Sequence, residues 1–537
     1  MSDTEKFDAI IVGLGHQGLT CANILAQNGL SVAVVDIQSP VPGGMSYDSF
    51  AEGCRTGPCA HAPVPVDQVL AERLGLEERG FMMKPEQTSS FAPGSIKDGA
   101  YLFATASRAA TQREIARLNE SDAAIFMEFS DQVHQIAQIL EQVGTTLPPY
   151  SLDGWKDLWG VFETGRLLST SGNDAQAMFA RLMNASLDQA VVEIFQSPQV
   201  RAFITAQATM ASMTVPGRKG SAASLIQYML GLGGHRPYRG DWQPLRGSLH
   251  HYMKALTQGA LDRDVAFFPG QTATRLRIDN ERVTGVVLND DSIIESAMVI
   301  GDLNPLALFD DLIGQDHVPA DLQMRLAPLR QGAGFVRLKV ALSALPKFAS
   351  LTGASDVDFL SGEILMAPSP AYISEARKDA KAEGGSHRPV ISMVIPSLTA
   401  DDLAPSGHHV ASIIAQYYEP NLPNDADNWG AIAESVYSAL ETVAPGFSRL
   451  VDTTAVYMGD NMARTIGPIN RESLGGGHPL TQLFGGLFGH HGLGASIPCQ
   501  NLLICGYGPE ASASPHFNRG GQTAAEMVLQ GVMQNAA

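Results

Sequence analysis

The opening stretch of the chain, residues 7–36, constrains the fold more than any other stretch. Six residues, Phe-Asp-Ala-Ile-Ile-Val, run into a Gly-x-Gly-x-x-Gly turn with glycine at positions 13, 15 and 18. An amphipathic run follows, and then a second apolar run that ends at Asp36. This order predicts a buried strand, a glycine turn, a helix and a second buried strand, which together form a dinucleotide-binding unit of the Rossmann type.

Each of these positions has a predicted role. Gly13 allows the tight turn, Gly15 lets the backbone approach a pyrophosphate, and Gly18 lets the helix pack close to the strand. The helix N-terminus faces the phosphates, because its backbone N–H groups attract negative charge. Asp36 ends the second strand, where a carboxylate can hold the adenosine ribose hydroxyls. A glycine turn alone is weak evidence. A dinucleotide site is favoured over an accidental turn because the strands, the helix and the acid all stand at the expected positions around it.

Length and charge exclude several classes of function. The 537 residues are too many for one hydrophobic core, so we expect two or more domains. The net charge of −19 argues against nucleic-acid binding and offers no basic surface for anionic lipid. We find no apolar signal segment and no uncharged run of membrane-spanning length, so we expect a cytoplasmic location and leave only peripheral membrane contact open. The five cysteines contain no Cys-x-x-Cys pair, and we expect no metal site.

The rest of the chain alternates between helical and α/β patterns. Apolar spacing predicts helices within 107–143, 174–213, 249–258 and 519–530. Short apolar runs predict strands at 265–268, 297–301, 335–342, 390–395 and 501–505, and a pair of strands within 272–287 around a turn at Asn280 and Glu281. A mobile charged loop is predicted at 375–388 and a second loop at 506–518. One domain is therefore expected to be built from three separated pieces of chain, with another inserted between them.

Seven short motifs are spread over nearly the whole chain. They are residues 13–19 (Gly-Leu-Gly-His-Gln-Gly-Leu), 42–44 (Pro-Gly-Gly), 56–58 (Thr-Gly-Pro), 283–286 (Val-Thr-Gly-Val), 304–305 (Asn-Pro), 480–484 (Leu-Thr-Gln-Leu-Phe) and 501–506 (Asn-Leu-Leu-Ile-Cys-Gly). Their order and spacing resemble the flavin-dependent phytoene desaturase and carotenoid isomerase family. The resemblance is closest to the subgroup that contains pyridine nucleotide-disulfide oxidoreductase domain-containing protein 2.

The resemblance implies a fold, a cofactor and a division of the chain. The fold class is α/β, with a Rossmann-like FAD-binding domain of the glutathione-reductase type assembled from residues 1–85, 240–325 and 470–537. An inserted α+β substrate-binding domain, with a helical part and a second sheet, takes residues 86–239 and 326–469.

The residues themselves agree with FAD as the cofactor. Asp36 is followed by Ile37 and Gln38, and neither is a basic residue that could take the 2′-phosphate of NADP. FAD is preferred to NAD because only one dinucleotide turn is present, while a second glycine-rich strand–helix junction closes the chain. The glycine-rich residues 231–234 follow a helical run rather than a strand, so we reject them as a second nucleotide site.

The predicted cofactor contacts come from the opening unit, the next glycine loop, the middle piece and the end of the chain. They are Gly13, Gly15, His16, Gln17, Gly18, Asp36, Ile37, Gly43, Gly44, Met45, Ala273, Gly506, Tyr507, Arg519, Gly520 and Gly521.

The chain departs from its relatives near the expected position of the flavin ring. Relatives usually carry a glycine-rich turn after the last strand, whereas here residues 509–518 replace it and only Gly520 and Gly521 follow. The catalytic candidates are His490, His491, His516 and Tyr507, in loops predicted to face the ring, where a histidine could act as a base or an orienting donor. The alternative is that these loops are structural. Residues 236–242 form a basic-aromatic cluster that could hold a carboxylate or aromatic substrate or form a solvated loop.

The leading hypothesis is an FAD-dependent oxidoreductase that dehydrogenates, or desaturates, a mainly apolar small molecule by hydride transfer to the flavin. One alternative is an amine or alcohol oxidase that uses oxygen. Another is a non-enzymatic escort for a prenyl lipid or a protein on the same fold. The sequence leaves the substrate, the electron acceptor and the oligomeric state open.

Overall fold

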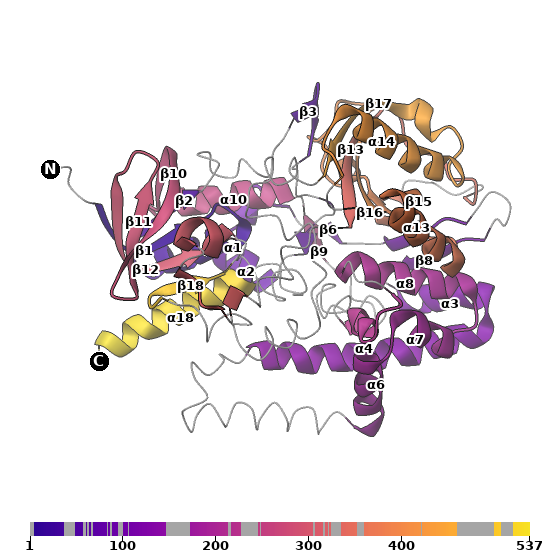
Figure 1. The fold of residues 1–537 in the computed structure, drawn as a ribbon, viewed down its shortest axis with the longest axis horizontal. Coiled ribbons are helices and arrows are strands. Elements are labelled where there is room, and N and C mark those ends of the chain that lie inside the picture. Colours follow the sequence, from indigo (N-terminus) through magenta and orange to yellow (C-terminus); the bar gives the residue numbers. More distant parts are fainter. Residues whose placement is uncertain are drawn as a thin grey trace.

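The computed structural model describes residues 5–36, 49–56, 61, 64–65, 68–82, 84–85, 88–94, 100–105, 107–145, 172–212, 216–226, 245–247, 249–303, 307–314, 317–320, 322–323, 334–351, 359–419, 422–458, 499–505 and 519–536. Figure 1 shows one sheet with its helices at the end of the molecule that holds both chain termini. A second sheet lies at the other end, with a group of helices beside it.

The first sheet draws its strands from three separated parts of the chain. They are β1 (Glu5–Val12), β2 (Val32–Asp36), β10 (Ala266–Asp279), β11 (Arg282–Leu288), β12 (Ile293–Gly301) and β18 (Leu502–Ile504). A parallel core runs in the order β10, β2, β1, β12, β18. The antiparallel strand β11 joins the far part of β10 to the start of β12. Asn280 and Glu281, both at positive φ, form the predicted turn of this hairpin.

Both faces of the parallel core are covered, because its central strands are apolar on both sides. One face carries α1 (His16–Gln27), α10 (Leu249–Leu261) and α18 (Arg519–Ala536), which pack with Ile11 and Val34. On the other face, Ile10 and Val35 pack with the two hairpins formed by β10, β11 and β12, and with the π-helix η4 (Ala307–Gly314). The predicted strand–helix–strand opening and the terminal strand and helix are confirmed.

The second sheet has the order β17, β13, β16, β15, β14, β7, β8. Its strands are β17 (Val451–Tyr457), β13 (Phe335–Leu342), β16 (His409–Tyr418), β15 (Gly385–Val394), β14 (Glu363–Met366), β7 (Thr88–Ala92) and β8 (Leu102–Thr105). Neighbouring strands are antiparallel except β14 and β7, which are parallel. Helix α14 (Ala426–Glu441) covers one face, where Leu338 and Ile413 pack with Val436. The predicted strand at 335–342 is confirmed with the same bounds.

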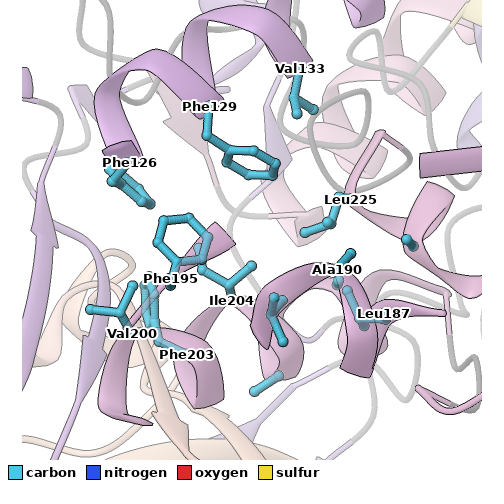
Figure 2. Close-up of a cluster of buried hydrophobic side chains, with 14 of the residues drawn as sticks. Phe126, Phe129, Val133, Leu187, Ala190, Phe195, Val200, Phe203, Ile204 and Leu225 are labelled. Carbon is cyan, nitrogen blue, oxygen red and sulfur yellow. The ribbon is translucent and has the colours of Figure 1, made fainter. Parts of the chain in front are cut away.

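The helical part comprises α3 (Arg108–Leu118), α4 (Glu120–Thr145), α6 (Asn173–Asn184), α7 (Leu187–Ile194) and α8 (Pro198–Ser212). Figure 2 shows Phe126 and Phe129 of α4 close to Phe195, which follows α7, with Phe203 and Ile204 of α8 beside it. Phe129 and Phe195 meet edge to face, with ring centroids 5.5 Å apart. The helical periodicity predicted for 107–143 and 174–213 is therefore confirmed, and its apolar side chains form a core.

The remaining helices and strands are mostly short. They are β3 (Ser49–Ala51), β4 (Cys54–Arg55), β5 (Val64–Pro65), β6 (Lys84–Pro85), β9 (Leu245–Gly247), α2 (Gln68–Leu74), α13 (Pro370–Glu383) and the one-turn helices η2 (Glu77–Arg79), η3 (Ser221–Ala223), η7 (Pro396–Leu398) and η8 (Phe447–Leu450). Strands β5, β9 and β6 form a small sheet, with β6 and β9 between the two large sheets in Figure 1. No helix among the described residues is long and apolar enough to cross a membrane.

The predicted mobile loop at 375–388 is wrong, because these residues belong to α13 and the start of β15. Ser369 caps the helix by accepting a hydrogen bond from the Tyr372 backbone N–H, and Pro370 occupies its first position. Gly384, at φ +81°, ends it. The sequence thus carries start and stop signals for a helix, and the density of charged residues between them reflects its exposed face rather than a loop.

Candidate functional site

The three glycines of the opening turn are required by close contacts. Gly13 has φ +114°, and a Cβ there would lie 2.4 Å from the backbone oxygen of Asp302. Gly15 has an ordinary φ of −76°, but a Cβ there would lie 2.4 Å from Asp302 Oδ2. A Cβ on Gly18 would lie 2.8 Å from Ile11 Cγ2. The turn therefore brings the start of α1 close to the ends of β1 and β12.

Asp302 follows β12 directly and is 3% exposed. Its backbone N–H donates to the Val12 carbonyl at 2.8 Å, and its Oδ2 accepts from the Gly18 N–H at 2.7 Å. Burial raises the pKa of this carboxyl to about 7, against the opposing effect of the Gly18 and Gly15 N–H groups, and the nearby Asp36 raises it further. Asp302 is not among the site residues predicted from the sequence. The available signal was an acid directly after a buried strand.

The candidate dinucleotide site lies at the carboxyl edge of the parallel core. Val12 of β1 pairs with Val35 of β2, and the Gly13 N–H donates to the Val35 carbonyl at 2.8 Å. Asp36, the last residue of β2, is 2% exposed. Because parallel strands end at the same edge, the glycine turn, Asp36 and Asp302 come together there. In open α/β sheets, ligands bind at this edge.

The terminal helix packs onto the same region. The Gly521 N–H donates to Gln17 Oε1 at 2.8 Å, and a Cβ on Gly521 would lie 2.2 Å from the Gln17 carbonyl oxygen. A Cβ on Gly520 would lie 2.3 Å from the Cys505 carbonyl oxygen. The structure therefore assigns Gly520, Gly521 and Gln17 a packing role between α18 and α1.

The other predicted contacts fall at several places. His16 is half-buried at the start of α1, and Ala273 is buried in β10 beside Thr272, which pairs with Asp36. Helix α18 begins at Arg519. The predicted residues Ile37, Gly43, Gly44, Met45, His490, His491, Gly506, Tyr507 and His516, and the cluster at 236–242, lie outside the described residues.

A second group of buried polar residues lies on the face of the second sheet opposite α14. Lys339 of β13 is fully buried, and its Nζ donates to Ser412 Oγ at 3.1 Å and to Thr56 Oγ1 at 3.2 Å. His61 Nδ1 lies 3.1 Å from Ser412 Oγ, and its Nε2 lies 2.9 Å from Ser392 Oγ. The His61 ring therefore bridges serines of the adjacent strands β16 and β15.

The hydrogen bonds continue across the sheet. Ser392 Oγ donates to Glu363 Oε1, and Ser90 Oγ donates to Glu363 Oε2 at 3.5 Å. Gln207 of α8 donates to Ser90 Oγ at 3.3 Å. We call this set the polar row, and it consists of Lys339, Ser412, His61, Ser392, Glu363 and Ser90. Apart from His61, its members follow the strand order β13, β16, β15, β14, β7.

The polar row has a consistent direction of donation. Because Ser412 accepts from Lys339, its hydroxyl hydrogen is available to His61 Nδ1, and the neutral ring then donates from Nε2 to Ser392. Burial, together with Arg337 and Lys339, holds the pKa of His61 well below its usual value. The row thus joins Lys339 to Glu363 through hydrogen bonds in which the imidazole is neutral at neutral pH.

The residues of the polar row are not among those predicted from the sequence. The signal in the sequence was the placement of Arg337 and Lys339 at alternate positions of an otherwise apolar strand, since a buried charge is retained only with partners. No cluster of His, Cys, Asp and Glu in the described part of the chain could hold a metal ion.

The two sheets and the glycine turn define a mixed α/β fold shared with solved oxidoreductases. An oxidoreductase from Methanosarcina mazei has a TM-score of 0.57 to this chain, at 14% identity, over 97% of this chain and 100% of that one. Wild-type putrescine oxidase bound to putrescine has a TM-score of 0.56, at 14% identity, over 98% of this chain and 99% of that one.

Among curated proteins, the chain is similar to pyridine nucleotide-disulfide oxidoreductase domain-containing protein 2 of Rattus norvegicus. The two are 23% identical over 550 residues, which are 98% of this chain and 94% of the relative. This confirms the predicted resemblance to that protein. No family model matches the chain.

Proposed function

We propose that the protein is an FAD-dependent oxidoreductase of the phytoene desaturase-like kind, which dehydrogenates a mainly apolar small molecule. The observation that carries the proposal is the convergence of the glycine turn, the α1 N-terminus and the buried Asp36 at one edge of the parallel core. The similarity to a protein named as an oxidoreductase and the fold shared with oxidoreductases support it.

The residues at this edge fit a dinucleotide. Helix α1 begins at this edge, where the N–H groups of a first turn can hold an anion, and one of them, that of Gly18, donates to Asp302. Asp36 would hold the adenosine ribose, and the start of α1 the pyrophosphate. We place FAD in a domain of residues 1–85, 240–325 and 470–537, of the glutathione-reductase type, with substrate between it and the domain of residues 86–239 and 326–469.

Bound FAD would supply the hydride acceptor. The protein's own task is then to position the substrate, exclude water and accept a proton. We propose two sets of groups for that proton: the predicted His490, His491, His516 and Tyr507, and the polar row. The row supports the role because it joins a neutral imidazole to the half-buried carboxylate of Glu363 through one serine.

A second candidate function is an amine or alcohol oxidase that uses oxygen. The buried polar face of the second sheet favours it, because such a face suits a polar substrate better than a hydrocarbon. Putrescine oxidase shares the fold. A non-enzymatic escort for a prenyl lipid or a protein is the remaining alternative, and it would not require flavin.

The test begins with the visible spectrum of the purified protein. FAD bound at about one per chain supports the oxidoreductase proposal, and a colourless protein that also fails to take up added FAD contradicts it. Anaerobic bleaching of the flavin is then followed with apolar alkenes, alcohols and amines. Bleaching by amines or alcohols, followed by rapid reoxidation in oxygen, would select the oxidase alternative.

A further inference from the structure

One carboxyl group lies against the first turn of α1, the end of the helix that the proposed cofactor would face. Asp302 Oδ2 accepts from the Gly18 N–H at 2.7 Å, and the Gly15 N–H also acts on this carboxyl. The Asp302 side chain is so close to the turn that a Cβ on Gly15 would lie 2.4 Å from Oδ2. The carboxyl of Asp302 therefore lies against the first turn of α1, where N–H groups attract negative charge.

A dinucleotide pyrophosphate carries two negative charges and is held by N–H groups at a helix N-terminus. A second anion in a buried site repels it, and the repulsion is strong because the dielectric constant is low. A protonated carboxyl removes this repulsion and offers an O–H donor in place of an acceptor.

We propose that FAD binding is coupled to the uptake of one proton by Asp302. The coupling rests on the proposed function, because FAD is taken as the ligand. Asp302 is then a residue that sets the pH range in which the protein loads its cofactor.

The surroundings of Asp302 support this assignment. Burial raises the pKa of Asp302 to about 7, against the hydrogen bond from the Gly18 N–H and with a smaller contribution from the nearby Asp36. An added anion moves the pKa of a neighbouring carboxyl upward. Below pH 7 the carboxyl is already protonated, so FAD binding takes up no proton. Above pH 7 each binding event must take one up, so the affinity for FAD falls as the pH rises.

The other titratable groups around Asp302 are identifiable. The Cys21 and Cys505 thiols face it from α1 and from the end of β18, and burial raises the pKa of both, so they stay neutral across the tested range. Asp36 faces it from β2. His16, the first residue of α1, is a further titratable group beside the glycine turn, so it needs its own variant.

The experiment measures FAD affinity between pH 5.5 and 9, using the full-length protein freed of flavin and the quenching of FAD fluorescence. Wild type should bind with nearly constant affinity below pH 6.5 and lose about tenfold per pH unit above pH 7.5. Asp302→Asn keeps an oxygen acceptor and loses the titrating group, so its affinity should stay flat. At pH 9 it should exceed the wild-type affinity by about 100-fold.

Two further variants isolate the cause. Asp291→Asn makes the same change in an exposed turn where positive φ suits asparagine. This variant should lose FAD affinity with rising pH as steeply as wild type does. His16→Gln should also keep the slope. If His16→Gln flattens the profile while Asp302→Asn does not, the proton belongs to His16 and the inference is overturned.

A direct count of protons covers the case in which Asp302→Asn does not fold. Wild-type protein is mixed with FAD in weakly buffered solution containing a pH indicator. About one proton should be taken up per FAD at pH 8, and close to none at pH 6. No uptake at pH 8 overturns the inference while leaving FAD binding intact. Failure of wild type to bind FAD at any pH would instead contradict the proposed function.

Discussion

Gly15→Ala tests the close contact on which the candidate site is built. Gly15 has φ −76°, which alanine adopts without strain, so any cost must come from the space around the new methyl group. That methyl would lie 2.4 Å from Asp302 Oδ2 and 3.0 Å from its Cγ. The carboxyl cannot retreat freely, because Oδ2 is held by the Gly18 N–H at 2.7 Å.

Two events would relieve this contact, and each has a free-energy cost. Overpacking by a methyl group costs about 1–3 kcal/mol, and a lost hydrogen bond to a carboxylate adds about 1–2 kcal/mol. We expect Gly15→Ala to lower the free energy of unfolding by about 2–5 kcal/mol. The measurement is urea-induced unfolding of the flavin-free protein, followed by far-ultraviolet circular dichroism.

A matched control and a second background make the test specific. Gly430 is exposed in α14 with nothing within 4 Å of an added Cβ, so Gly430→Ala should stabilise by about 0.5–1 kcal/mol through helix propensity. In an Asp302→Ala background the obstructing carboxyl is gone, and Gly15→Ala should then cost less than about 1 kcal/mol. An equal cost in both backgrounds would refute the reasoning.

Three further predictions follow from other contacts. Because folding lowers the pKa of His61, the free energy of unfolding should fall as the pH drops below about 6.5, by up to about 1.4 kcal/mol per pH unit. His61→Gln should remove this part of the loss, as measured by urea unfolding at pH 5 and pH 7. Gln17→Ala leaves the buried Gly521 N–H without its acceptor, which should cost about 1–2 kcal/mol. The backbone amides at the start of α18 should then exchange hydrogen about 5- to 30-fold faster. Unchanged exchange rates would contradict the contact. NADH and NADPH should leave the oxidised flavin spectrum unchanged over many minutes without oxygen, because the sequence contains one dinucleotide turn, and rapid bleaching by either would contradict a single-nucleotide site.

The polar row and Asp302 share a reason for having escaped sequence analysis. Lys339, Ser412 and Glu363 each look like an isolated polar residue in a strand that is otherwise apolar. Their connection depends on strands β13, β16, β15 and β14 being neighbours, although they follow a different order along the chain. His61 joins them from a distant segment, and its two contacts, to Ser412 and Ser392, span 351 and 331 positions.

Local patterns in the sequence by themselves determined the strand–helix–strand opening, the hairpin at Asn280, strand β13 and helix α18. Each of these is specified by apolar periodicity and by glycine within a few residues, so neighbouring side chains carry the information. Tertiary structure alone decided that Asp302 meets Gly15 and Gly18, and that the polar row runs through five strands. Those contacts depend on sheet order and register, which are set by how distant segments bury their apolar faces together.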